Sequence, residues 1–321
     1  MAAGKKQHGW RNTFVIAVVI LLLIITPLLL YASSDIEKKD LDDAARTQQG
    51  GAYIKLPDGV THYELTGTEA GQVVVLMHGA TIPMYLWDEQ FTALARAGYR
   101  VLRYDMYGRG YSDRPAGDYS QAFYRKQLLD LLNTLKIKQP VDLVGLSMGG
   151  GLAMDFTANY PDRVKDIVLI APVINSIKND TVFKLMRIPV VGDFLTRLIA
   201  VKVMSDRAAQ LMQKSPRAAE YAVMFSDQTR FKGFEKASLA AARSDAWADY
   251  TADYQAVGGQ DRSILLIWGT EDNDVSPEMV QAMRKALPNV QFKQLDNIGH
   301  DPQVEVPDTV NSLLIDFLKQ Q

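Results

Sequence analysis

One long apolar run stands near the start of the chain. Residues 14–30 read FVIAVVILLLIITPLLL without a charge, and Tyr31 and Ala32 extend the run to about the length that a helix needs to cross a bilayer. The run predicts a transmembrane helix over residues 14–32. A cleaved signal peptide is the alternative, because a basic segment precedes the run and Ala32-Ser33-Ser34 loosely resembles a cleavage site. We favour the anchor, because the run is longer than a usual signal core.

The charges on either side of this run differ in sign. Lys5, Lys6 and Arg11 precede it, whereas residues 35–43 hold five acids and two lysines. Since cytoplasmic flanks carry the excess of basic residues, we expect residues 1–13 in the cytoplasm and the main body exported, in the periplasm or another extracytoplasmic space. Residues 33–50 are polar and end in Gln-Gln-Gly-Gly, which predicts a linker.

From residue 51 onward, short apolar runs alternate with segments of helical length. The expected strands cover residues 52–56, 60–65, 73–78, 99–104, 141–145, 166–170, 264–268 and 290–295, and the clearest helices cover residues 87–97, 120–135 and 148–160. Pro57-Asp58-Gly59 predicts a hairpin between the first two strands. Strands that alternate with helices predict an α/β fold, with a mostly parallel sheet and helices on both faces.

The alternation stops once, over about ninety residues without a strand pattern. Pro172, Pro189 and Pro216 divide this stretch into several helices. We expect residues 172–261 to form a helical cap inserted after the sixth strand, over a core of residues 51–171 and 262–321. The alternative is a set of helices packed on the outside of the sheet.

Composition narrows the possible functions. With 321 residues and 47% hydrophobic content, the chain buries a sizeable core, and its net charge of −2 gives no general attraction to nucleic acid. The absence of cysteine excludes disulfides, thiolate metal sites and a cysteine nucleophile. The four histidines are far apart in the sequence, so we expect neither a metal nor another cofactor.

A single serine lies among glycines in the stretch VGLSMGGGL, residues 144–152. Gly145, Ser147 and Gly149 satisfy the G-x-S-x-G pattern, and the serine follows an expected strand and precedes an expected helix. This context is typical of a nucleophile elbow, a tight turn that lifts a serine hydroxyl above the end of a sheet. Ser147 is therefore the candidate nucleophile.

A serine needs a base, and the base needs a carboxylate. His300 follows the last expected strand, whereas His8, His62 and His78 lie before the membrane run, in the hairpin and at a strand end. The loop at residues 269–274 offers Asp272 and, as the alternative, Asp274. Serine, acid and histidine then follow one another in the order Ser147, Asp272, His300.

These motifs together resemble the α/β-hydrolase superfamily over residues 53–319. The residues that carry the resemblance are Leu76-Met77-His78-Gly79, the segment YDMYGRGYS at residues 104–112, Gly145 to Gly150, Trp268 to Asp272, and Gly299-His300. The resemblance is closest to capped serine esterases, monoacylglycerol lipases and C–C hydrolases. It implies that Asp272 is the triad acid and that the backbone N–H groups of Met148 and Ala80 form the oxyanion hole, with Thr81 as the alternative to Ala80. It also implies a mainly structural role for Asp105, Gly108, Arg109 and Ser112.

Ser147 stands where related dehalogenases and epoxide hydrolases carry a carboxylate, so acyl transfer to water is the expected chemistry. The cap range is rich in methionines, aromatic residues and aliphatic residues, among them Val182, Phe183, Met204, Met224 and Phe225, which suits an apolar acyl chain. We expect a membrane-anchored esterase or lipase that acts on short and medium acyl esters, monoacylglycerols included. A C–C hydrolase and a cofactor-free perhydrolase or haloperoxidase with the same triad are alternatives, and a non-catalytic ligand-binding protein is a remote one.

Overall fold

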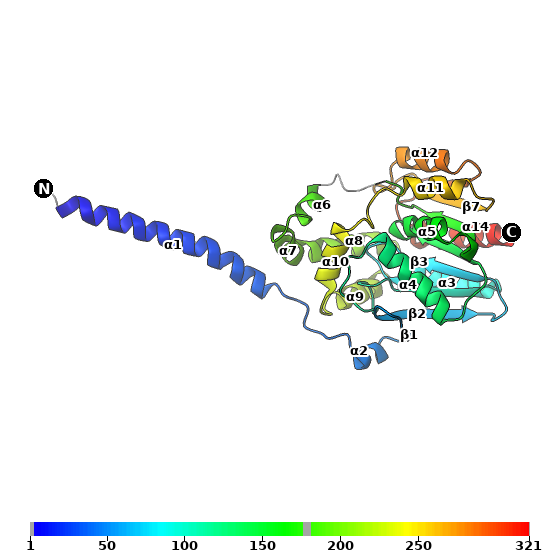
Figure 1. The fold of residues 1–321 in the computed structure, drawn as a ribbon, viewed down its shortest axis with the longest axis horizontal. Helices are drawn as coiled ribbons and strands as arrows, with labels where there is room; N and C mark the ends of the chain where they lie inside the picture. Colours follow the sequence, from blue (N-terminus) through cyan, green and yellow to red (C-terminus); the bar gives the residue numbers. More distant parts are fainter. Residues whose placement is uncertain (1–2, 176–180, 321) are drawn as a thin grey trace.

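The structure, a computed structural model, describes residues 3–175 and 181–320, without the side chains of residues 3–13, 24, 181–183 and 200. The side chains of Lys5, Lys6, Arg11, Val182 and Phe183 therefore lie outside the described residues. The predicted membrane run lies in the helix α1 (Ala3–Ser33), which projects from the body as an isolated rod in Figure 1. Among the described residues, one helix is long and apolar enough to cross a membrane, at Phe14–Ser33.

The body is built on one eight-stranded sheet in the order β1-β2-β4-β3-β5-β6-β7-β8. The strands are β1 (Ala52–Lys55), β2 (Val60–Gly67), β3 (Val73–Met77), β4 (Arg100–Tyr104), β5 (Val141–Leu146), β6 (Val164–Ile170), β7 (Ile264–Gly269) and β8 (Gln291–Leu295). β1 and β2 form the predicted hairpin, β2 runs antiparallel to β4, and all other neighbours are parallel. The predicted mostly parallel α/β sheet is confirmed.

Helices cover both faces of this sheet. The core helices are η1 (Met84–Trp87), α3 (Asp88–Arg96), α4 (Gln121–Thr134), α5 (Met148–Asn159), η2 (Pro161–Arg163), α11 (Thr251–Gly258), α12 (Pro277–Ala286), α13 (Pro302–Glu305) and α14 (Pro307–Lys319). α3 packs with α14, while α4, α5, α11 and α12 pack side by side in a row. The central strands β3 and β5 are buried along their whole length, because a parallel sheet that is covered on both faces buries both sets of side chains.

The predicted cap is a group of helices between β6 and β7. These are α6 (Thr181–Met186), α7 (Val191–Leu195), the π-helical turn η4 (Thr196–Ala200), α8 (Val201–Met212), α9 (Ala218–Gln228) and α10 (Phe234–Arg243). The predicted boundary at residue 261 needs correction, since α11 packs on α5 and α12 and the hydroxyl of Tyr254 donates to the carbonyl of Val173. α11 is thus one of the sheet-covering helices, so the alternative reading holds for this one element.

Residues 34–50 do more than connect α1 to the sheet. They include a short helix, α2 (Asp43–Thr47), and an isolated β-bridge between Lys39 and Phe231 of the cap region. Arg46 is buried and forms an ion pair with Asp113 in the core. The segment that we predicted to be a linker therefore packs along both the cap and the core.

Candidate active site

The turn between β5 and α5 holds Ser147 in a strained conformation. Its φ of 51° and ψ of −118° lie where side-chain-bearing residues are rare. A Cβ at Gly149 would lie 2.4 Å from the carbonyl oxygen of Met77, and a Cβ at Gly145 would lie 2.5 Å from the carbonyl oxygen of Gly149. The glycines of the G-x-S-x-G pattern therefore permit a close backbone approach, which places Ser147 at the carboxyl edge of the sheet.

Two backbone amides near Ser147 are positioned as free donors. Met148 is the first residue of α5, and Gly79, the residue before Ala80, lies so close that its added Cβ would be 3.5 Å from the Cβ of Ser147. In the part of the chain that the structure describes, the N–H groups of Met148 and Ala80 donate to no protein acceptor. Both residues are buried, and their two unpaired N–H groups are the candidate oxyanion donors.

The loop that carries Ala80 is braced by a buried arginine. Arg109 Nε donates to the carbonyl oxygen of Ala80 at 2.5 Å, and its Nη1 donates to Ser238 Oγ at 3.2 Å. Its guanidinium also lies 5.6 Å from the ring centroid of Phe234. Ser238 and Phe234 belong to α10, so one side chain links the candidate oxyanion loop to the cap.

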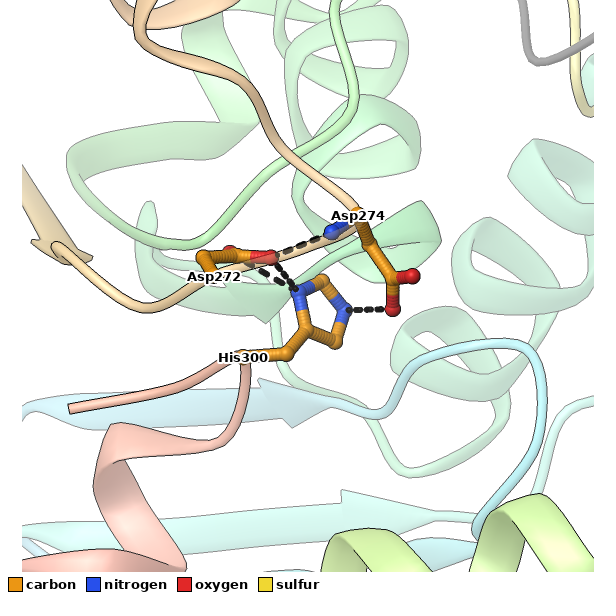
Figure 2. A group of neighbouring side chains, drawn as sticks. All are labelled: Asp272, Asp274 and His300. Carbon is orange, nitrogen blue, oxygen red and sulfur yellow. Dashed lines mark hydrogen bonds and ion pairs between the residues drawn. The ribbon is translucent and has the colours of Figure 1, made fainter.

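His300 and Asp272 form a buried pair at the same edge of the sheet (Figure 2). His300 Nδ1 donates to the carboxylate of Asp272, at 3.0 Å from Oδ1 and 2.9 Å from Oδ2. Asp272 Oδ1 also accepts hydrogen bonds from the backbone N–H groups of Asp274 at 2.8 Å and Val275 at 3.0 Å. These amides fix the carboxylate, and the carboxylate fixes the orientation of the imidazole ring.

Asp274 lies on the other side of the ring. Its Oδ2 is 3.7 Å from His300 Nε2, and Arg207 of α8 forms an ion pair with the same carboxylate. Between Ser147 and His300, both within the described residues, there is no hydrogen bond. The structure thus pairs the predicted base with Asp272, and it leaves Nε2 facing Asp274 instead of the serine.

The surroundings of His300 favour its protonated form. Burial lowers the pKa, but the hydrogen bond and charge of Asp272, with the charges of Asp301 and Asp274, outweigh burial and raise the pKa of His300 to about 9. Three carboxylates within reach of one imidazole explain the direction of this change.

A second link connects the cap to the loop of His300. Glu305 Oε1 accepts from the backbone N–H of Gly299 at 3.0 Å, and Lys214, beyond the end of α8, forms an ion pair with Oε2 of the same carboxylate. Arg207 therefore contacts the loop of the candidate acid directly, whereas Lys214 reaches the loop of the candidate base only through Glu305 of α13.

Asp272, Asp274 and His300 also form a group whose ligand atoms lie within 4.8 Å of one another. Such a group has the residue types of a metal site. Here, however, the Asp272 carboxylate accepts two backbone N–H groups and His300, and the Asp274 carboxylate is paired with Arg207. We therefore interpret the group as an acid–base cluster.

The sequence reasoning left two contributors out. The resemblance implies only a structural role for Arg109, within the segment at residues 104–112. Apart from that motif, nothing in the sequence indicates its hydrogen bond to the Ala80 carbonyl. The contact of Arg207 with Asp274 has no local signal in the sequence, because it joins residues 67 positions apart. Asp105, by contrast, has the expected bracing role, since it accepts from the backbone N–H of Met84 and Tyr111 and pairs with His62.

Comparison with known proteins agrees with this architecture. The family described as alpha/beta hydrolase fold matches residues 72–307. Lipase 1 from Psychrobacter immobilis is 26% identical over 264 residues, which cover 77% of this chain and 76% of that protein. The 2-hydroxy-6-oxononadienedioate/2-hydroxy-6-oxononatrienedioate hydrolase from Paraburkholderia phymatum is 28% identical over 286 residues, which cover 84% of this chain and 95% of that protein.

Among solved structures, a thermophilic esterase from Thermogutta terrifontis is similar in fold. It aligns with a TM-score of 0.71 at 23% identity, over 84% of this chain and 99% of that one. The family match covers strands β3 to β8, the serine turn and the histidine loop, and the predicted resemblance is confirmed. The chain therefore belongs to the α/β-hydrolase fold family, and its relatives indicate a hydrolase.

Proposed function

We propose that this chain is a serine hydrolase that cleaves carboxylic esters through an acyl-enzyme on Ser147. The observation that carries the proposal is the placement of a strained serine turn and a buried His300–Asp272 pair at the same carboxyl edge of the sheet. The relatives include an esterase and a lipase by name, which agrees with this chemistry.

In this mechanism Ser147 Oγ attacks the ester carbonyl while His300 Nε2 accepts its proton. Nε2 must then meet the serine instead of Asp274. Asp272 holds the Nδ1–H and stabilises the imidazolium, and the N–H groups of Met148 and Ala80 bind the oxyanion. His300 next protonates the leaving alcohol, and water attacks the acyl-enzyme by the reverse proton path.

The substrate that we propose is a short or medium acyl ester, with monoacylglycerols in the same class. Apolar residues of the cap support this choice. Met204, Leu211 and Met224 are partly buried against the core cluster, and Phe225 is fully buried within it. Flexible methionines adapt to acyl chains of different length.

A panel of p-nitrophenyl esters from acetate to palmitate, hydrolysed by the full chain and by Ser147→Ala, tests this proposal. We expect turnover with a maximum at short or medium chains and its loss in the variant. If the folded protein cleaves no ester, peracid or diketoacid substrate, the non-catalytic ligand-binding role takes its place.

The relative from Paraburkholderia phymatum supports a second candidate, hydrolysis of a C–C bond next to a ketone, because its printed name describes that class of substrate and the alignment covers 95% of it. The same triad serves this reaction. Preference for a small dienoic diketoacid over every ester of the panel would favour the second candidate.

We also propose that α1 is an uncleaved anchor with the body on the extracytoplasmic side. The apolar span of α1 is not buried against the rest of the molecule, and Tyr31 at its end still contacts the cap. Alkaline phosphatase fused to the C-terminus should be active, and the protein should stay in the membrane after carbonate extraction at the mass of the full chain. A shorter soluble product would indicate a cleaved signal peptide.

A further inference from the structure

The cap exposes a set of large apolar side chains. We call the following residues the cap patch, and each is between 40% and 78% exposed: Leu185, Ile188, Val190, Val191, Ile199 and Val203. They come from α6, the turn before α7, α7 itself, η4 and the start of α8. Monomeric soluble proteins rarely gather such side chains on one surface unless the surface binds something apolar.

The cap patch adjoins the end of α1. The ring of Tyr31 stacks on Phe194 of α7 with centroids 5.6 Å apart, and the guanidinium of Arg197 in η4 lies 4.3 Å from the centroid of the Tyr31 ring. Figure 1 shows α6 and α7 at the edge of the body nearest α1. Two elements that carry the cap patch, α7 and η4, are therefore in contact with the end of the apolar helix.

The chain after α1 keeps the cap in this position. The Glu37 carboxylate accepts the backbone N–H groups of Gly233 at 2.8 Å and Glu235 at 2.5 Å, at the start of α10. Two residues later, Lys39 exchanges backbone hydrogen bonds with Arg230 and Lys232. Because only a few residues separate these bonds from the end of α1, the cap is the part of the body closest to the membrane that α1 would cross.

Charge on this surface also fits a bilayer. Lys184 and Arg187 are exposed and lie next to Leu185 and Ile188 in the sequence, and neither has an ion-pair partner among the residues that the structure describes. Basic side chains beside exposed apolar ones are typical of segments at the headgroup boundary, where the cation meets phosphate and the apolar group enters the acyl region.

We propose that the cap patch lies in the headgroup and upper acyl region of the same bilayer that α1 crosses. This proposal rests on the anchored ester hydrolase of the preceding subsection and adds the route of the substrate. A lipid-phase ester enters beneath the cap from the membrane. The occupant of the cap patch is thus a phospholipid surface, not a second copy of the chain.

Site-specific fluorescence on the full chain tests this placement. Because the chain has no cysteine, Ile199→Cys and Val203→Cys each create a unique site for an NBD label. Val223→Cys is the control, since Val223 is an exposed valine of α9 outside the cap patch, with a relative exposure of 69% against 51% for Ile199 and 54% for Val203. The labelled proteins are reconstituted in phosphatidylcholine–phosphatidylglycerol vesicles that contain doxyl-labelled phosphatidylcholine as a quencher.

We expect lipid-borne doxyl to quench labels at residues 199 and 203 several-fold more than the label at 223. Equal quenching at all three positions would overturn the proposal. A blue-shifted label at 199 or 203 that lipid does not quench would also overturn it, because protein would then cover the cap patch.

Activity gives a second, separate readout. Ile188→Glu combined with Val203→Glu should leave turnover of a water-soluble ester unchanged and lower turnover of a vesicle-borne long-chain ester at least several-fold. Equal effects on the two substrates would count against membrane entry. If the unmodified chain hydrolyses no ester, the proposed function fails, and the quenching ratio still decides the placement of the cap.

Discussion

At the scale of single residues, the main feature is a histidine between two carboxylates. Asp272 binds Nδ1 of His300, and Asp274 lies 3.7 Å from Nε2 while it is paired with Arg207 of the cap. Asp272 is buried, and two backbone N–H groups hold its carboxylate in place. Asp274, in contrast, is partly exposed. We infer that Asp272 orients the base and that Asp274 modulates its charge.

The protonation of His300 should make the activity depend on pH. A protonated His300 cannot accept the proton of Ser147, so kcat/KM should fall as pH decreases through its pKa, which is raised to about 9. Asp274→Asn removes one charge that raises this pKa and should move the acid limb of the profile to lower pH. Arg207→Gln leaves the Asp274 charge unpaired and should move the limb to higher pH.

Profiles of kcat/KM between pH 5 and 10 measure both shifts. On the acid limb of the profile, a shift of one pH unit changes kcat/KM at a fixed pH about tenfold. Shifts of the same sign in the two variants would contradict this role of Asp274. The exposed Lys202→Gln variant is the control, because Lys202 pairs with Asp206 on its own helix.

Arg109 should affect the rate through the loop that carries Ala80. Arg109→Met removes the bond to the Ala80 carbonyl and should lower kcat by roughly tenfold to a hundredfold with little change in KM, because a displaced oxyanion donor weakens only transition-state binding. Ser238→Ala removes only the bond to the cap and should have a much smaller effect. Steady-state kinetics, with thermal melts as a check of folding, measure both. A pure change in KM would show that Arg109 acts on substrate binding.

At the scale of elements, the serine turn depends on close packing between β5, α5 and β3. Gly149→Ala would bring a Cβ within 2.4 Å of the Met77 carbonyl oxygen and 2.5 Å of the His78 carbonyl oxygen. Because both neighbours are backbone atoms, they cannot move aside as a flexible side chain does.

We therefore predict that Gly149→Ala lowers the free energy of unfolding by about 2–4 kcal/mol or abolishes folding. Gly259→Ala is the matched control: its Cβ would be 3.7 Å from the nearest atom and its φ is −85°, so stability should stay within about 1 kcal/mol of the original. Urea unfolding curves compare the two. Equal stabilities would contradict the close-packing explanation of the G-x-S-x-G pattern.

Most of these elements were predictable from the sequence. The strands alternate with helices of clear length, and in the structure the side chains of Ser120 and Ser276 each accept a backbone N–H at the start of α4 and α12. The boundary of the cap was not predictable, because α11 has no feature that separates a cap helix from a sheet-covering one until its contact with α5 is known. The role of residues 34–50 was missed for a similar reason, since its hydrogen bonds join positions almost two hundred residues apart.

At the scale of the whole molecule, the cap connects three parts. Phe194 and Arg197 contact the end of α1, and Arg109 of the core donates to Ser238 of α10. Arg207 pairs with Asp274 in the loop of the acid, and Lys214 pairs with Glu305, which accepts a hydrogen bond from the loop of the base. A displacement of the cap would therefore alter the charge around His300 as well as the entrance to Ser147. In the membrane placement that we propose, these contacts would connect the bilayer surface to the candidate active site.

The central claim is that Ser147 forms a covalent intermediate, and peptide mass spectrometry after treatment with a fluorophosphonate tests it most directly. We predict one adduct, on the peptide that contains Ser147, which is absent in Ser147→Ala and strongly slowed in His300→Ala. An unlabelled Ser147 in folded protein, or an adduct on another residue that persists in Ser147→Ala, would contradict the claim.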